Sequence, residues 1–136
     1  MTEVGMQLRS VVKERRFAQS PEKVWRALTQ KYLIADWLMA NDFKPEVGHR
    51  FVLDAEWGQI TCDVLAVEPQ KFLSYSWQSQ GLDSVVTWTL TSTADGTHLK
   101  MVQTGFGADQ ELAYRGATTG WTRFLDRLEV VVCDHD

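Results

Sequence analysis

The chain has 136 residues, of which 44% are hydrophobic and 24% charged, and its formal net charge is −4. These values are typical of one globular domain spanning residues 1–136. They argue against nucleic acid as a partner, which needs a concentrated basic surface, and against membrane insertion, which needs ~18 consecutive apolar residues. Residues 1–10 lack the apolar core of a secretory signal, so we expect a cytoplasmic protein. Its two cysteines, Cys62 and Cys133, are expected to be free thiols.

The first half of the chain predicts a strand followed by two short helices. Residues 7–17 mix apolar and charged side chains, which is typical of a strand with one solvent-exposed face. Ser20 is a suitable N-cap, and Pro21 then occupies the first helical position, where its missing N–H costs nothing. We therefore expect one helix over 21–29 and a second over 31–38, before a loop over 41–48.

The middle of the chain predicts five more strands, because apolar and polar residues alternate with a period of two. An Asp95-Gly96 pair indicates a tight hairpin between the last two of them. The expected strands cover residues 51–57, 59–67, 72–78, 84–91 and 97–104.

From residue 109 to 133 the hydrophobic period changes to that of a helix, with one broad apolar stripe that includes Trp121, Leu125 and Leu128. Gly120 is expected to let this helix approach the sheet closely. The predicted fold is α+β: a curved six-stranded antiparallel sheet is wrapped around a long C-terminal helix, with two short helices between strands 1 and 2.

Several sequence blocks, in this order and spacing, resemble those of the AHSA1-like family (activator of Hsp90 ATPase homologue 1-like) within the START-like, Bet v 1-like (SRPBCC) superfamily. The blocks are Ser20–Thr29, Ala35–Leu38, Phe43–Phe51, Val67–Pro69, Leu73–Trp77, Val86–Leu90, Gly96–Leu99, Thr104–Phe106 and Gly120-Trp121. The resemblance implies a helix-grip fold, with a role in stress response or in lipid or aromatic metabolism. It also allows a chaperone or client protein as partner.

The sequence offers little catalytic or metal-binding chemistry. The three histidines, His49, His98 and His135, have no metal-ligand spacing, and His98 is expected to be exposed. No serine or cysteine lies in a nucleophile motif. We therefore predict no catalytic residues, no metal and no cofactor.

The high aromatic content of 11% is the remaining signal, because so many rings either fill a core or line a cavity. Both alternatives stay open. Three of the candidate cavity residues flank loops and are expected at the mouth: Trp37, Phe106 and Tyr114. The other candidates are Phe51, Leu53, Trp57, Tyr75, Trp77, Trp88, Met101, Gln103 and Trp121. Further candidate polar groups are Thr61, Thr119 and Arg115.

We therefore predict that a monomer or homodimer binds a small hydrophobic or amphipathic molecule between the sheet and the C-terminal helix. A protein-binding module related to the Hsp90 activator is one alternative. A cyclase or hydrolase is another, with Tyr75, Asp36 and Glu56 as its only candidate acid or base groups.

Overall fold

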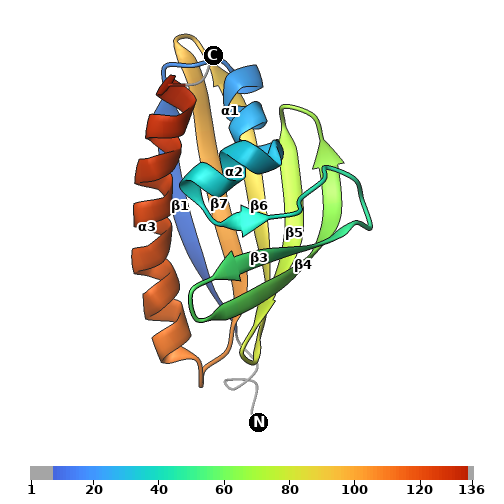
Figure 1. Cartoon of the computed structure of the whole chain (residues 1–136). Coiled ribbons are helices and arrows are strands. Elements are labelled where there is room, and N and C mark those ends of the chain that lie inside the picture. The colour runs from blue at the N-terminus through green and yellow to red at the C-terminus, as the bar shows by residue number, and fades with distance from the viewer. Residues whose placement is uncertain (1–7, 135–136) are drawn as a thin grey trace.

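The computed structural model describes residues 8–134, which form one antiparallel sheet and three helices. The strands lie in the order β1-β7-β6-β5-β4-β3-β2. Figure 1 shows α3 running alongside β1 and β7, with α1 and α2 near the C-terminal end of α3. The elements are β1 (Arg9–Phe17), α1 (Pro21–Thr29), α2 (Lys31–Trp37), β2 (Ala40–Asn41), β3 (Arg50–Ala55), β4 (Gly58–Glu68), β5 (Phe72–Ser79), β6 (Leu82–Thr93), β7 (Gly96–Phe106) and α3 (Glu111–Asp134).

This architecture confirms the predicted α+β helix-grip fold, with one correction to the strand count. The sheet has seven strands where the sequence predicted six, because β2 lies in part of the expected loop. In β2, Ala40 pairs with Asp54 and Asn41 pairs with Leu53. Two residues are too few to show an alternating pattern, so periodicity could not predict this strand.

The start of α1 has the predicted cap. The hydroxyl oxygen of Ser20 accepts a hydrogen bond from the backbone N–H of Lys23, and Pro21 occupies the first turn. Val24 and Leu28 point into the core, and Trp25 is half-buried against it. The amphipathic pattern therefore fixes which face of α1 meets the sheet.

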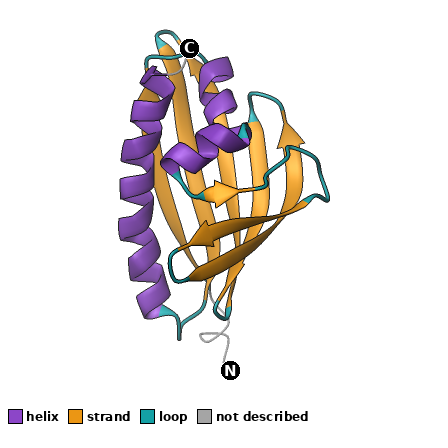
Figure 2. Ribbon diagram, in the orientation of Figure 1, coloured by secondary structure: helices purple, strands orange, loops and turns teal. Residues whose placement is uncertain are grey.

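The core lies between the concave face of the sheet and the helices, which Figure 2 shows gathered on that side. Alternate residues of the central strands enter it, as the period of two requires. Trp88 of β6 is fully buried and makes edge-to-face contacts with Trp37 at 5.7 Å and with Trp121 at 5.6 Å, measured between ring centroids. These rings join α2, the sheet and α3 into one core.

The odd-numbered residues of β1 point inward, and two of them bind side chains of α3. Arg15 of β1 forms ion pairs with Asp126 and Glu129 of α3, and the Lys13 amine donates to the Thr122 hydroxyl at 3.0 Å. The edge strand of the sheet is thereby held against the helix along most of its length. No helix within residues 8–134 is long and apolar enough to cross a membrane.

Candidate ligand-binding groove

A groove with a cavity volume of about 650 Å³ lies between the first half of α3 and the strands that face it. We call it the α3 groove. Its size lies within the range of ordinary small-molecule sites, ~300–1,000 Å³. Its lining residues are Met39, Trp57, Ile60, Trp77, Ser79, Gln80, Leu82, Gln103, Asp109, Gln110, Glu111, Leu112, Ala113, Gly116, Ala117, Gly120, Trp121 and Phe124.

The groove exists because the first half of α3 carries small side chains on the face that looks toward the sheet. The lining residues there include Gly116 and Gly120, one helical turn apart. All buried residues of α3 come from Trp121 onward. The second half of the helix therefore packs on the sheet, while the first half leaves space.

Gly120 does not serve the close approach that the sequence suggested. A Cβ atom placed there would have only the ring of Phe124 within 4 Å, at an ordinary 3.9 Å, and one on Gly116 would meet nothing within 4 Å. The expectation was wrong because no sheet atom lies within 4 Å of either Cβ position. Both glycines keep the groove open.

Aromatic rings form the walls of the groove. Trp77 of β5 and Trp121 of α3 lie with ring centroids 5.3 Å apart, and Phe124 packs edge-on against Trp121 at 5.6 Å. Trp57, in the turn between β3 and β4, is 57% exposed. A ligand in the groove would therefore meet flat, largely apolar surfaces.

A buried polar network lies at the deep wall. Gln103 of β7 is 1% exposed, and its side-chain oxygen accepts a hydrogen bond from the Trp121 indole N–H at 2.6 Å. Its amide nitrogen donates to the Ser84 hydroxyl oxygen at 3.0 Å, and that hydroxyl donates to the Trp77 carbonyl at 2.9 Å. The partners that a buried amide needs thus come from the protein itself.

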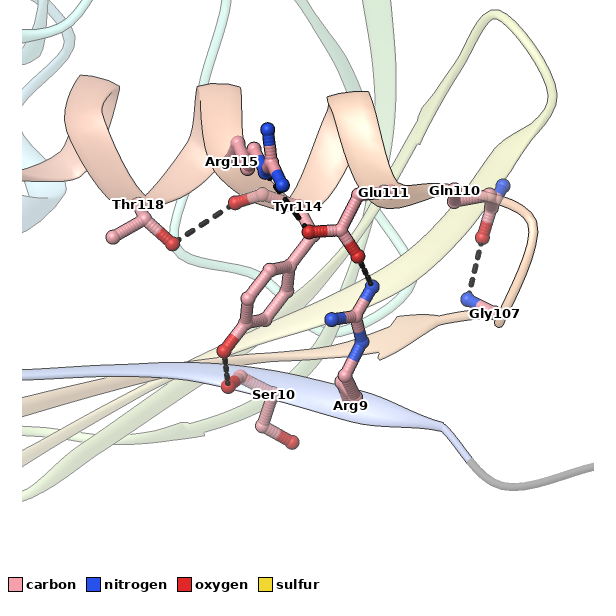
Figure 3. Close-up of polar contacts among 8 residues, drawn as sticks. All are labelled: Arg9, Ser10, Gly107, Gln110, Glu111, Tyr114, Arg115 and Thr118. Atoms are coloured by element: carbon pink, nitrogen blue, oxygen red, sulfur yellow. Dashed lines mark hydrogen bonds and ion pairs between the residues drawn. The ribbon is translucent and has the colours of Figure 1, made fainter. Parts of the chain in front are cut away.

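The rim beside the start of α3 is polar (Figure 3). Glu111 forms ion pairs with Arg9 at 2.7 Å and with Arg115 at 2.9 Å. Hydrogen bonds from these two guanidinium groups, that of Arg9 first, lower the pKa of the Glu111 carboxyl. Arg9 also lies over the ring of Tyr114, 4.2 Å from its centroid. This cluster ties the first turn of α3 to β1.

Comparison with protein-family models gives a match over residues 18–132, to the family described as Activator of Hsp90 ATPase homolog 1-like protein. The chain belongs to this family. A search of curated proteins found no match.

Solved structures of similar proteins include two bacterial relatives. The protein MLL2253 from Mesorhizobium loti is 54% identical, with a TM-score of 0.90, and the match covers 94% of this chain and 99% of that one. The protein BH1534 from Bacillus halodurans is 32% identical, with a TM-score of 0.81 and coverage of 91% and 96%.

A third solved structure shares the fold. DynU16, from the dynemicin biosynthetic locus, is 24% identical, with a TM-score of 0.82. The match covers 92% of this chain and 47% of DynU16.

The structure divides the twelve candidate cavity residues of this family member into three groups. Four of them line the α3 groove: Trp57, Trp77, Gln103 and Trp121. Four border a void of only about 10 Å³ inside the core: Trp37, Phe51, Leu53 and Tyr75. The remaining four line neither space: Trp88, Met101, Phe106 and Tyr114.

The predicted mouth was wrong for two of its three residues. Trp37 is buried, and its indole N–H donates to the carbonyl of Ala27 at 2.8 Å. Phe106 is fully buried against the ring of Tyr114, and only Tyr114 is partly exposed. Their place beside loops in the sequence did not reveal that helices pack over them.

Other sequence-based candidates also lie away from the groove. Thr61 points to the opposite face of β4 from the buried Ile60 and Cys62, and Thr119 and Arg115 are exposed on α3 outside the lining. Of the candidate acid or base groups, Asp36 and Glu56 are exposed outside the lining too.

Tyr75, the third candidate acid or base, is buried in the core, where burial raises the pKa of its hydroxyl. Its oxygen accepts a hydrogen bond from the Trp88 indole N–H at 3.0 Å. The tyrosine therefore has no access to the α3 groove.

Sequence reasoning missed groove residues that lie in turns and at the ends of helices and strands, where periodicity carries no signal. These are chiefly Met39, Gln80, Leu82, Asp109 and Leu112. The two glycines one turn apart in the predicted last helix were a usable sign, because glycine weakens a helix interior by ~1 kcal/mol without a packing or functional reason.

The remaining titratable candidates are the three histidines. Within residues 8–134, no three His, Cys, Asp or Glu side chains gather to hold a metal ion. His98 is half-buried, contrary to expectation, because it bonds to Glu14 across the strands at 2.7 Å. His49 contacts the carbonyl of Asp42, and His135 lies outside the described residues.

Proposed function

We propose that this protein binds one small, largely apolar or amphipathic molecule in the α3 groove. The observation that carries the proposal is the groove itself: a cavity of about 650 Å³ with tryptophan walls at one end of an otherwise tightly packed core. Binding in the groove removes the apolar surface of the ligand from water, which contributes ~25 cal/mol per Å² before the costs of association.

Two features of the rim support this proposal. Leu112 at the start of α3 is 83% exposed, and Trp57 on the β3–β4 turn is 57% exposed, although both are large apolar side chains that line the groove. Exposed apolar side chains that border one concave site are typical of a place where a ligand binds.

The test is a titration with N-phenyl-1-naphthylamine, an uncharged aromatic probe whose fluorescence rises in apolar surroundings. We expect saturable binding with a stoichiometry of one. Gly116→Leu adds a side chain at a lining position where a Cβ atom would meet nothing within 4 Å, so it takes up space in the groove. We expect it to weaken binding at least tenfold.

The matched control is Thr119→Leu, which adds an apolar side chain at an exposed position of the same helix, outside the groove lining. It should leave the affinity for the probe unchanged. Binding that does not saturate, or binding that Gly116→Leu and Thr119→Leu affect equally, would contradict the proposal.

A further inference from the structure

We propose that the α3 groove selects ligands by the charge of their polar end, accepting uncharged or cationic amphiphiles and rejecting carboxylates, with Asp109 as the residue that faces this end. The inference deepens the proposed function and rests on it. The basis is the set of polar side chains along the groove. Some of them already have partners within the protein, and the others are available to a ligand.

The deep wall directs the ligand's apolar part inward. Its polar side chains, Gln103 and Ser84, are both buried and bonded within the protein, to Trp121 and to the Trp77 carbonyl. Among the described residues, no buried side-chain nitrogen or oxygen lacks a hydrogen-bond partner. A polar ligand group placed here would lose its bonds to water and compete with the bonds that these side chains already make. This favours the rim as the place of the polar end.

Two of the rim's polar side chains are already engaged. Glu111 binds both Arg9 and Arg115, and neither arginine is among the lining residues. The side-chain oxygen of Gln110 accepts from the Gly107 N–H at 2.7 Å, and its nitrogen donates to the Gly81 carbonyl at 3.2 Å. Figure 3 shows Glu111 turned toward Arg9 and Gln110 turned toward Gly107.

Among the described lining residues, the charged group that remains for a ligand is a carboxylate, and the other polar side chains left, Ser79 and Gln80, are uncharged. Asp109 is exposed and lines the groove, and no ion pair involves it within residues 8–134. No lysine, arginine or histidine belongs to the lining. A carboxylate head group would therefore meet the Asp109 charge without a lining cation to offset it, whereas an ammonium or hydroxyl group would find an acceptor.

Two more lining residues, Gln80 and Trp57, are available to a head group at the rim. Gln80 also lines the groove, and it holds a left-handed backbone conformation with φ of 49°, in which a residue other than glycine is strained. Such strain is often concentrated at ligand sites. The exposed indole of Trp57 offers a ring face that attracts cations.

The experiment measures the affinities of three ligands with the same ten-carbon chain by calorimetry at pH 7, below their micellar concentrations. The ligands are decylammonium, 1-decanol and decanoate. We expect decylammonium and 1-decanol to bind at least tenfold more tightly than decanoate. Asp109→Asn should weaken decylammonium binding about fivefold, which is what a partly exposed charge pair contributes, and leave 1-decanol unchanged.

Asp95→Asn is the matched control, since it makes the same change of net charge on the turn between β6 and β7, away from the groove lining. An equal effect of Asp95→Asn and Asp109→Asn would overturn the proposal, because attraction to the negative protein as a whole would then explain the preference. Decanoate binding as tightly as decylammonium would overturn it too, while leaving the proposed function intact. Failure of all three ligands to bind would contradict the proposed function itself.

Discussion

The indole N–H of Trp121 donates a 2.6 Å hydrogen bond to the side-chain oxygen of Gln103, and this bond joins α3 to the sheet at the deep wall of the groove. Both residues are buried. The bond lies where α3 changes from its open first half to its packed second half. It therefore fixes the position of the ring that separates the groove from the core.

Replacing Gln103 with leucine tests this role. The variant keeps the side-chain size but leaves the Trp121 indole N–H without its acceptor, which costs about 2 kcal/mol in the free energy of unfolding. Urea unfolding measures the loss. Trp121→Phe should cost less in the Gln103→Leu background than in the native protein, because the bond is already gone. Equal costs in both backgrounds would show that the two side chains are not coupled.

The sequence predicted most of the fold because its local signals agree with one another. Ser20 and Pro21 mark the start of α1, the alternation of apolar residues marks the strands, and the stripe that includes Leu125 marks α3. The two-residue strand β2 was not predicted, because so short a segment shows no hydrophobic period and is defined only by its pairing with β3.

The candidate site was harder to predict because it depends on where the helices pack against the sheet and where they leave space. Alternation in β3 continues as far as Trp57, which suggested an inward ring, but the strand ends at Ala55 and Trp57 lies in the turn. Whether Trp37 borders a cavity or the core depends on how α2 sits on the sheet, and no pattern along the chain records that. The groove instead follows from Gly116 and Gly120, whose spacing was visible in the sequence.

A second prediction concerns Gly96, which begins β7. A Cβ atom there would lie 1.9 Å from the carbonyl oxygen of Phe17, so Gly96→Ala must push β1 away from the hairpin. We expect it to lower the free energy of unfolding by about 3 kcal/mol or more. Gly58→Ala is the matched control, because Gly58 also has a positive φ but nothing within 4 Å. It should cost only about 1 kcal/mol, and a similar cost for both variants would show that the contact with Phe17 is unimportant.

The third prediction concerns the attachment of β1 to α3. Arg15 bonds to Asp126 and Glu129 and is 23% exposed, so Arg15→Met should lower the free energy of unfolding by about 1 kcal/mol, and by less in high salt. Arg16 is exposed and alternates to the other side of the same strand. Arg16→Met should therefore change stability by less than about 0.5 kcal/mol. Denaturant unfolding at two salt concentrations checks both values, and a salt-independent loss in Arg15→Met would point to lost packing instead of lost charge.

The fourth prediction concerns the two thiols. Cys62 is buried and Cys133 is exposed, and burial, reinforced by the charge of Asp63, raises the pKa of the Cys62 thiol to about 12. Ellman's reagent at pH 8 should therefore label one thiol of the native protein quickly and the second only in urea. Cys133→Ser should abolish the fast reaction. Rapid labelling of Cys62 in the native protein would contradict its burial.

The same raised pKa makes stability depend on alkaline pH. In the unfolded chain the Cys62 thiol ionises near its ordinary value of 9.0, whereas the folded protein keeps the proton up to about pH 12. The folded state therefore binds more protons in this window, and the free energy of unfolding should fall as the pH rises from 8 to 10, by about 1 kcal/mol. Urea unfolding at each pH measures the slope. Cys62→Ala should remove this contribution and Cys133→Ser should retain it, and identical slopes in the two variants would assign the effect to other groups.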